Sequence, residues 1–171
     1  AGASGRVGRL AAVARVLGRL PVPLHAVIAA GTDAALAARL RRMVAGDDRI
    51  RVVGYVDNIR TLMAAADVLV TKAGGVSLAE ALAAELPIVC FGSLPGHEAR
   101  NERFVVACGA ALAARSPGEL GRTLRSALGN PDVVARLREG IRAARRPHAA
   151  RDVADHVLRL AAGARATASA A

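Results

Sequence analysis

Short apolar runs alternate with longer segments of helical periodicity along the first two thirds of the chain. Most of these runs are continuous rather than interrupted by polar residues, which is typical of strands buried on both faces of a sheet. Strands that alternate with helices predict an α/β fold, here a Rossmann-like, doubly wound parallel sheet. The expected strands are residues 24–30, 50–55, 67–71, 87–92 and 110–114.

The segments between these strands have the apolar spacing of helices that cover a sheet. After Ser116 and Pro117 the pattern is wholly helical, and no change in composition marks a second domain. We therefore expect one domain over residues 1–163 and a disordered tail of small residues over 164–171. The expected helices are residues 6–20, 33–45, 59–66, 77–85, 98–108, 118–128, 132–145 and 149–160.

Composition limits the class of protein. A hydrophobic fraction of 53% and a mean hydropathy of +0.32 exclude a disordered chain. No apolar run approaches the roughly 20 residues that cross a bilayer, so a soluble, cytoplasmic protein is expected. Cys90 and Cys108 have neither CxxC spacing nor a nearby set of histidines, which predicts reduced cysteines and no metal site. The first residue is alanine rather than methionine, which favours a fragment or a processed chain.

The formal net charge of +10 raises the question of an anionic partner. Only 2% of the residues are aromatic, which leaves almost no stacking surface for bases, so we expect no nucleic acid partner. An arginine-rich composition with solvated helix faces explains the charge better than a dedicated partner does. If an anionic partner exists, a membrane surface suits two arginine clusters better than a duplex. These clusters are Arg39, Arg41, Arg42 and Arg136, Arg138, Arg142, Arg145, Arg146.

In a parallel α/β sheet, ligands bind at the carboxyl ends of the strands, where helix N-termini offer free N–H groups to anions. Gly74 and Gly75 stand between a strand and a helix, and residues without Cβ let the backbone approach a ligand such as a diphosphate. An ordinary tight turn explains the two glycines equally well. No GxxxxGK[ST] pattern surrounds Lys72, so a P-loop is excluded.

The acid that follows these glycines has two interpretations. Ser77 and Glu80 have the spacing of a capping box, in which Glu80 accepts a hydrogen bond from the Ser77 N–H. An acid in the first turn of a helix that faces the strand ends also fits two ribose hydroxyls. The residues alone favour the cap. The loop LPGHEARN adds His97, Glu98 and Asn101 at another strand end, each weak evidence by itself.

A glycine triplet at Gly2, Gly5 and Gly8, with Asp33 after the next strand, also matches an NAD(P)-binding reductase or epimerase. The remaining sequence does not follow that plan, because Tyr55 is not followed four residues later by lysine.

The stretch VTKAGGVSLAEALAAELPIVCFGSLPGHEARN resembles the carboxy-terminal domain of glycosyltransferase family 28, which includes monogalactosyldiacylglycerol synthases and MurG-like enzymes. The likeness continues upstream through GYVDNIRTLMAAADVLVTKAGG and downstream through PGELGRTLRSALGNPDVVARLR. The family has the two-domain GT-B fold, so the resemblance implies the carboxy-terminal, donor-binding half of such an enzyme. His97 stands where the galactolipid synthases usually carry glutamine, which leaves the donor sugar open.

The resemblance also implies a role for each candidate residue, and it outweighs the capping-box interpretation of Glu80. Backbone N–H groups at the start of the helix would bind the diphosphate, Glu80 would bind the ribose hydroxyls, and the turn after residue 53 would cover the uracil. The implied nucleotide-sugar-binding residues are Tyr55 and Val56 for the base, Gly74, Gly75, Val76 and Ser77 for the diphosphate, Glu80 for the ribose, and His97, Glu98 and Asn101 for the donor sugar and phosphate.

The implied function is the UDP-sugar-binding half of a hexosyltransferase of glycolipid biosynthesis, with a lipid acceptor and no cofactor. The family's general base belongs to an amino-terminal acceptor domain, so we expect no catalytic residue in this chain and no activity from it alone. A peripheral position on the inner face of the plasma membrane is compatible with such an acceptor. Two alternatives remain: an NAD(P)-binding Rossmann domain, and a non-catalytic nucleotide-binding domain that pairs with a separate acceptor chain.

In this family a glycine-rich loop, here residues 1–5, follows the first and central strand of the domain. The chain begins at the loop. We therefore expect strands 24–30 and 67–71 to flank an unfilled position in the sheet.

Overall fold

The computed structural model of the protein describes residues 7–168. Every expected strand is confirmed, each slightly shorter than predicted and within the predicted range. The strands are β1 (Ala26–Ala29), β2 (Ile50–Val53), β3 (Leu69–Thr71), β4 (Ile88–Phe91) and β5 (Ala111–Ala114).

The expected helices are also confirmed, and four of them begin at a side-chain cap. Asp33, Asn58, Ser116 and Asn130 each accept a hydrogen bond from a backbone N–H in the first turn, at 2.8 to 3.4 Å. The helices are α1 (Val7–Arg19), α2 (Ala34–Met43), α3 (Ile59–Ala64), α4 (Gly75–Ala83), α5 (His97–Ala107), α6 (Pro117–Gly129), α7 (Pro131–Ala144) and α8 (Ala149–Ala168).

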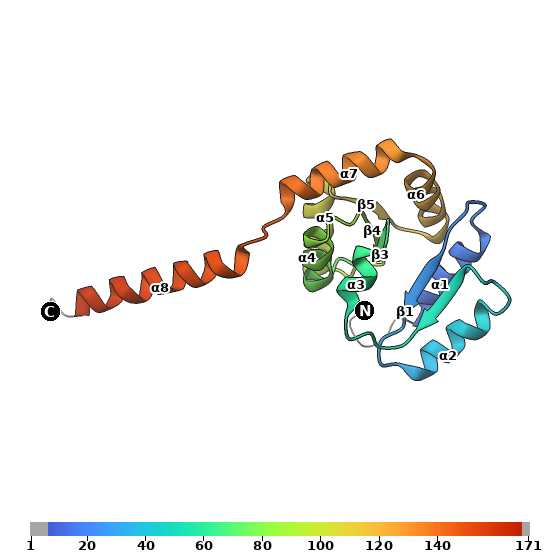
Figure 1. Ribbon diagram of the computed structural model, residues 1–171, viewed down its shortest axis with the longest axis horizontal. Helices are drawn as coiled ribbons and strands as arrows, with labels where there is room; N and C mark the ends of the chain where they lie inside the picture. Colours follow the sequence, from blue (N-terminus) through green and yellow to red (C-terminus); the bar gives the residue numbers. More distant parts are fainter. Residues whose placement is uncertain (1–6, 169–171) are drawn as a thin grey trace.

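All strand pairs are parallel, but the strands form two sheets rather than one (Figure 1). The first sheet is β1-β2, with Ala26 opposite Ile50, and the second is β3-β4-β5. In the second sheet Ile88 lies between Leu69 and Ala111. β1 and β3 do not pair with each other, so the expected interruption lies between these two strands.

Helices cover both faces of the second sheet, as β4 shows. Val89 belongs to a hydrophobic core formed with α1, α2 and α6, whereas Ile88 and Cys90 belong to a second core formed with α4, α5 and α7. All three side chains are fully buried. Because successive strand residues point to opposite faces, this alternation is the doubly wound arrangement that the sequence predicts.

α8 projects away from the rest of the molecule (Figure 1). Its side chains are exposed from residue 149 to residue 162, including Val153, Val157, Leu158 and Leu160. The helix runs to Ala168, past residue 163, where the folded domain was expected to end. Within the described residues, no helix combines the length and apolarity needed to cross a membrane.

Candidate functional site

The loops that follow β3 and β4 meet at the carboxyl ends of these strands. The Ala73 N–H donates to Ser93 Oγ at 3.1 Å, and Asn101 Nδ2 donates to the Ala73 carbonyl at 3.0 Å. The Lys72 ammonium forms an ion pair with the Glu98 carboxylate. Both backbone groups of Ala73 are therefore bound by the segment that follows β4, one by its loop and one by α5, and Ala73 itself is completely buried. These contacts make the two loops one structural unit.

Helix α4 begins with an open N-terminus. Gly74 is its N-cap residue, with φ −71° and ψ 133°, and provides no side chain to cap the helix. The first backbone hydrogen bond, from Leu78 N to Gly74 O, is 3.0 Å long. In the described part of the chain, the N–H groups of Gly75, Val76 and Ser77 have no acceptor. Gly75 and Val76 are exposed, so an anion can reach these donors from solvent.

Packing within the described part of the chain does not require glycine at position 74 or 75. A Cβ on Gly74 would lie 3.9 Å from Lys72 Nζ, and a Cβ on Gly75 would lie 3.8 Å from Asn101 Nδ2. Both distances are ordinary van der Waals contacts, and neither glycine has a positive φ. The absence of side chains therefore leaves open the space in front of the α4 N-terminus.

The capping box is not formed, because α4 starts two residues earlier than predicted and Ser77 lies inside the helix. Glu80 is consequently in the second turn, not in the first turn where the sequence placed it. Its side chain is half-buried, and its carboxylate has no hydrogen bond to any described residue. Glu80 is thus available as an acceptor on the same helix as the free N–H groups.

The three residues that the sequence predicted after β4 lie in the first two turns of α5 and differ in what they contact. His97 is the exposed first residue of α5. Glu98 binds Lys72 with one carboxylate oxygen and accepts a 2.9 Å hydrogen bond from Leu94 N with the other. Asn101 is bound to Ala73, as described above. Glu98 and Asn101 therefore fix the shape of the loops, while His97 faces solvent.

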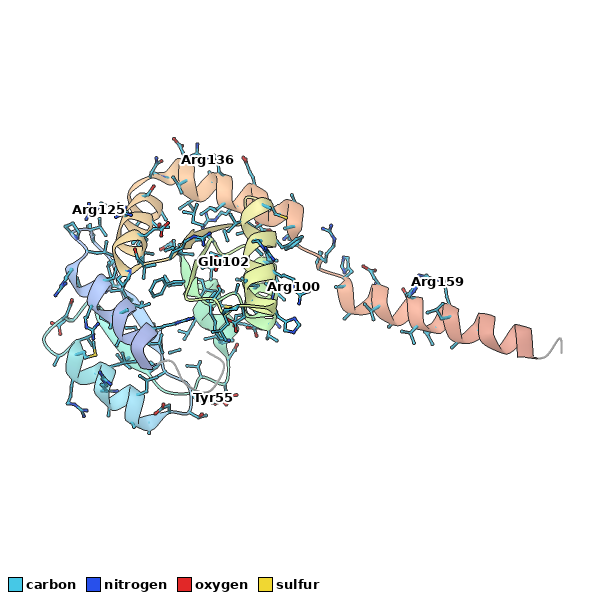
Figure 2. All side chains as sticks on the ribbon, turned by 180° about the vertical axis from the view of Figure 1, so that it is seen from behind. Tyr55, Arg100, Glu102, Arg125, Arg136 and Arg159 are labelled. Carbon is cyan, nitrogen blue, oxygen red and sulfur yellow. The ribbon has the colours of Figure 1, made fainter. Side chains whose placement is uncertain are left out.

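The predicted base-binding residues lie in the turn after β2. Tyr55 is 69% exposed, and Figure 2 shows it at the edge of the molecule. Val56 is half-buried. No hydrogen bond in the described residues joins this turn to the start of α4 or α5. The glycine-rich segment 1–5 lies outside the described residues.

Sequence reasoning did not place Lys72, Ser93 and Arg9 in the site. The one signal in the sequence that could have pointed to Lys72 is that it is the only lysine of the chain. The Arg9 side chain crosses over Gly92 at the end of β4, where a Cβ on the glycine would lie 2.6 Å from Arg9 Cδ. Gly92 has a φ of 79°, and Arg9 Nη1 is buried without a hydrogen-bond partner among the described residues.

The cysteine nearest in the sequence to the second loop and the possibility of a metal centre can both be assessed from the described residues. Burial raises the pKa of the Cys90 thiol to about 12, and the negative charge of Glu102 adds to this increase. The thiol is therefore neutral at physiological pH. Among the described residues, no group of three His, Cys, Asp or Glu side chains is placed to hold a metal ion. What this edge of the sheet offers is hydrogen-bond donors for an anion and one free carboxylate.

A family model described as glycosyl transferases group 1 matches residues 9–130. A processive diacylglycerol beta-glucosyltransferase of Bacillus mycoides is 29% identical over 159 residues, which is 92% of this chain and 41% of that protein. Among solved structures, MurG of Acinetobacter baumannii superposes with a TM-score of 0.75 at 21% identity, over 86% of this chain and 46% of that one. HepE of Anabaena, solved in complex with UDP and glucose, superposes with a TM-score of 0.65 at 17% identity, over 82% of this chain and 40% of that one. The chain thus spans less than half the length of these proteins.

Proposed function

Because the chain belongs to the glycosyl transferases group 1 family, we propose that it is the donor-binding domain of a glycosyltransferase that transfers a hexose from a UDP-sugar to a lipid-type acceptor. The observation that carries this proposal is the open N-terminus of α4. Three N–H groups lie there on the same helix as the carboxylate of Glu80, and neither they nor this carboxylate have a hydrogen-bond partner among the described residues. A nucleoside diphosphate presents the complementary groups, a diphosphate for the donors and ribose hydroxyls for the acid.

The proposed chemistry is displacement at the anomeric carbon of the donor. A hydroxyl oxygen of the acceptor forms a new bond to that carbon while the bond from the carbon to the diphosphate oxygen breaks. UDP leaves with the electron pair of that bond, and the hydroxyl proton passes to a base outside this chain. The N–H groups of Gly75, Val76 and Ser77, together with the positive end of the α4 dipole, would stabilise the charge that develops on the diphosphate. His97 would contact the hexose and affect the choice of sugar. No residue of this chain is assigned as the general base.

The proposal also includes the acceptor of the hexose and the location of the domain in the cell, which the geometry of the site does not address. Support for a lipid acceptor comes from the likeness to the diacylglycerol-directed enzyme of Bacillus mycoides. We place the domain on the cytoplasmic side, peripheral to the inner face of the plasma membrane, where exposed arginines of α2 would face anionic lipid. Arg142 and Arg145 contribute less to such a surface, because both pair with Glu85.

Calorimetric titration of the 171-residue chain with UDP tests the proposal. We expect a dissociation constant in the millimolar to micromolar range, about 4 to 8 kcal/mol of binding free energy. Glu80→Gln should weaken the binding of UDP by about 1.5 to 3 kcal/mol, because a charged acceptor for the ribose hydroxyls is lost. Glu139→Gln, which changes an exposed acid of α7, is the matched control and should have no effect.

Analogues of the ribose sharpen this test. If Glu80 binds the ribose, 2′-deoxy-UDP should bind the parent chain more weakly than UDP, and the Glu80→Gln variant should no longer discriminate between the two. Equal UDP affinity in parent and variant would remove Glu80 from the site. Binding of NADPH without binding of UDP would overturn the proposed function in favour of the NAD(P) alternative.

A further inference from the structure

A depression lies along α5, next to the β4–α5 loop of the proposed donor site. Its volume is about 480 Å³. Glu98, Asn101 and the buried Val105 mark the face of α5 that contacts the β3–α4 loop and the core. The depression involves the other side of the helix and the residue that follows β5. It is lined by Gly96, Ala99, Arg100, Glu102, Arg103 and Arg115.

Three of these six residues are arginines, and none of the three guanidinium groups pairs with a described residue. Arg100, Arg103 and Arg115 are exposed and have no side-chain hydrogen bond or ion pair with a described residue. Elsewhere the chain does pair such groups: Arg49 binds Asp47, and Glu85 binds two arginines of α7. The three arginines therefore place positive charge along the depression, and no described residue forms an ion pair with them.

The only acid in the lining is Glu102, which is half-buried and also lacks a described partner. Figure 2 shows Arg100 and Glu102 on α5, with Arg100 toward the outside of the molecule. Three guanidinium groups and one carboxylate leave the depression with an excess of positive charge. Guanidinium groups are the preferred protein donors for phosphate oxygens, because their planar N–H groups can bind two oxygens at once.

We infer that this depression is a second anion site, which binds the phosphate group of a ligand other than the UDP-sugar. The ligand class is a phosphate monoester or diester, either free in solution or in the headgroup of a lipid. The site shares none of the donor-binding residues, so it does not depend on the proposed function. Gly96 and Ala99 place it within one helical turn of His97, on the border of the proposed sugar site.

Titration of the 171-residue chain with glycerol 3-phosphate at low salt tests the free form of the ligand. Arg103→Gln and Arg115→Gln should each weaken binding about tenfold, the cost of losing one charge-assisted contact. Arg125→Gln, which removes an exposed arginine of α6, is the charge-matched control and should change binding less than about twofold. Glu102→Gln should instead strengthen binding severalfold, because it removes the carboxylate that repels the phosphate.

Vesicles distinguish the two sources of phosphate. Sedimentation with phosphatidylglycerol vesicles, compared with phosphatidylcholine vesicles, should show binding that Arg103→Gln and Arg115→Gln reduce and Glu102→Gln increases if the ligand is a lipid headgroup. Binding of glycerol 3-phosphate with no such vesicle response would assign the site to a free phosphate ester. If neither probe binds, or if Arg125→Gln reduces binding as much as the pocket variants, the inference is wrong.

The same variants separate this inference from the proposed function. UDP affinity should be unchanged in Arg103→Gln and Arg115→Gln, because these residues do not touch the α4 N-terminus. Loss of UDP affinity in both variants would show that the depression is part of the donor site. Failure of the parent chain to bind UDP would leave the phosphate site standing.

Discussion

At the scale of single residues, the Cys90 thiol makes the stability of the protein depend on pH in the alkaline range. Its pKa is raised from 9.0 to about 12 in the folded protein, chiefly by burial, so the unfolded chain loses this proton at lower pH. Below pH 9.0 the thiol is protonated in both the folded and the unfolded protein, and its contribution to the free energy of unfolding is fully present. As the pH rises from 9.0 toward 12, only the unfolded chain loses the proton, so this contribution is lost. Between pH 9 and pH 11 the loss amounts to about 2 kcal/mol.

Cys90→Ala isolates this effect. The variant should be less stable than the parent at neutral pH, because it leaves a small cavity. The difference between parent and variant should shrink by about 2 kcal/mol between pH 9 and pH 11, since only the parent has this thiol to deprotonate. Urea unfolding across that range measures the difference. Parallel stability curves would show that the thiol titrates alike in both states.

The residues of the candidate site were predicted from the sequence better than their contacts were. Gly74, Gly75 and His97 lie at adjoining strand ends, as the motif predicted, whereas Glu80 lies in the second turn of α4 and not in its first turn. The pairing of Lys72 with Glu98 joins residues 26 positions apart in the chain, and no local pattern encodes it. The roles of the predicted residues in binding a nucleotide sugar stay predictions.

At the scale of elements, α7 approaches the end of α5 so closely that one position must be glycine. A Cβ on Gly140 would lie 2.4 Å from the carbonyl carbon and oxygen of Gly109 and 2.6 Å from the carbonyl oxygen of Cys108. All three are backbone atoms and have no side-chain freedom with which to move away. Gly140→Ala should therefore destabilise the protein by about 3 kcal/mol, since α7 must shift off β5.

Gly129→Ala is the matched control for this prediction. Gly129 is the last residue of α6, and nothing lies within 4 Å of the position that its Cβ would take. Alanine is the better helix former, so the control should be neutral or more stable by up to about 1 kcal/mol. Urea unfolding compares the two variants. Similar losses in both would contradict the close packing of α7 against residue 109.

Element type was predictable because the apolar periodicity of each segment is strong, whereas one boundary near the site was not. The spacing of Ser77 and Glu80 matches a capping box, but helix α4 starts at Gly75. Gly74 has the extended backbone of an N-cap residue without offering a side chain, so the helix begins before the first capping side chain appears. A local pattern does not reveal such a start, because the contacts of Ala73 with the other loop fix it.

At the scale of the whole molecule, the interruption between β1 and β3 leaves each strand with one unpaired edge. In the described residues these edges have no partner, although α1 packs against strands of both sheets. Unpaired backbone groups at a sheet edge are costly when buried and prone to association when exposed. We predict that a strand-forming segment added before residue 1 stabilises the protein by pairing with both strands.

Thermal unfolding of an extended chain tests this prediction. A segment of five or six β-branched residues should raise the melting temperature by several degrees, because each kcal/mol of added stability shifts it by about 2 to 4 °C in a domain of this size. The same extension with two central prolines is the control, since proline lacks the N–H that pairs with a neighbouring strand. Equal melting temperatures of the two extended chains would show that no strand enters between β1 and β3.

The projecting helix α8 affects how the size of the protein is measured in solution. A helix of 20 residues is about 30 Å long, comparable to the diameter of the body from which it projects. A particle of this form has a larger hydrodynamic radius than a sphere of the same 17.4 kDa. It also tumbles faster about its long axis than across it. An apparent mass above 17.4 kDa in gel filtration is therefore expected of the monomer and does not indicate a dimer.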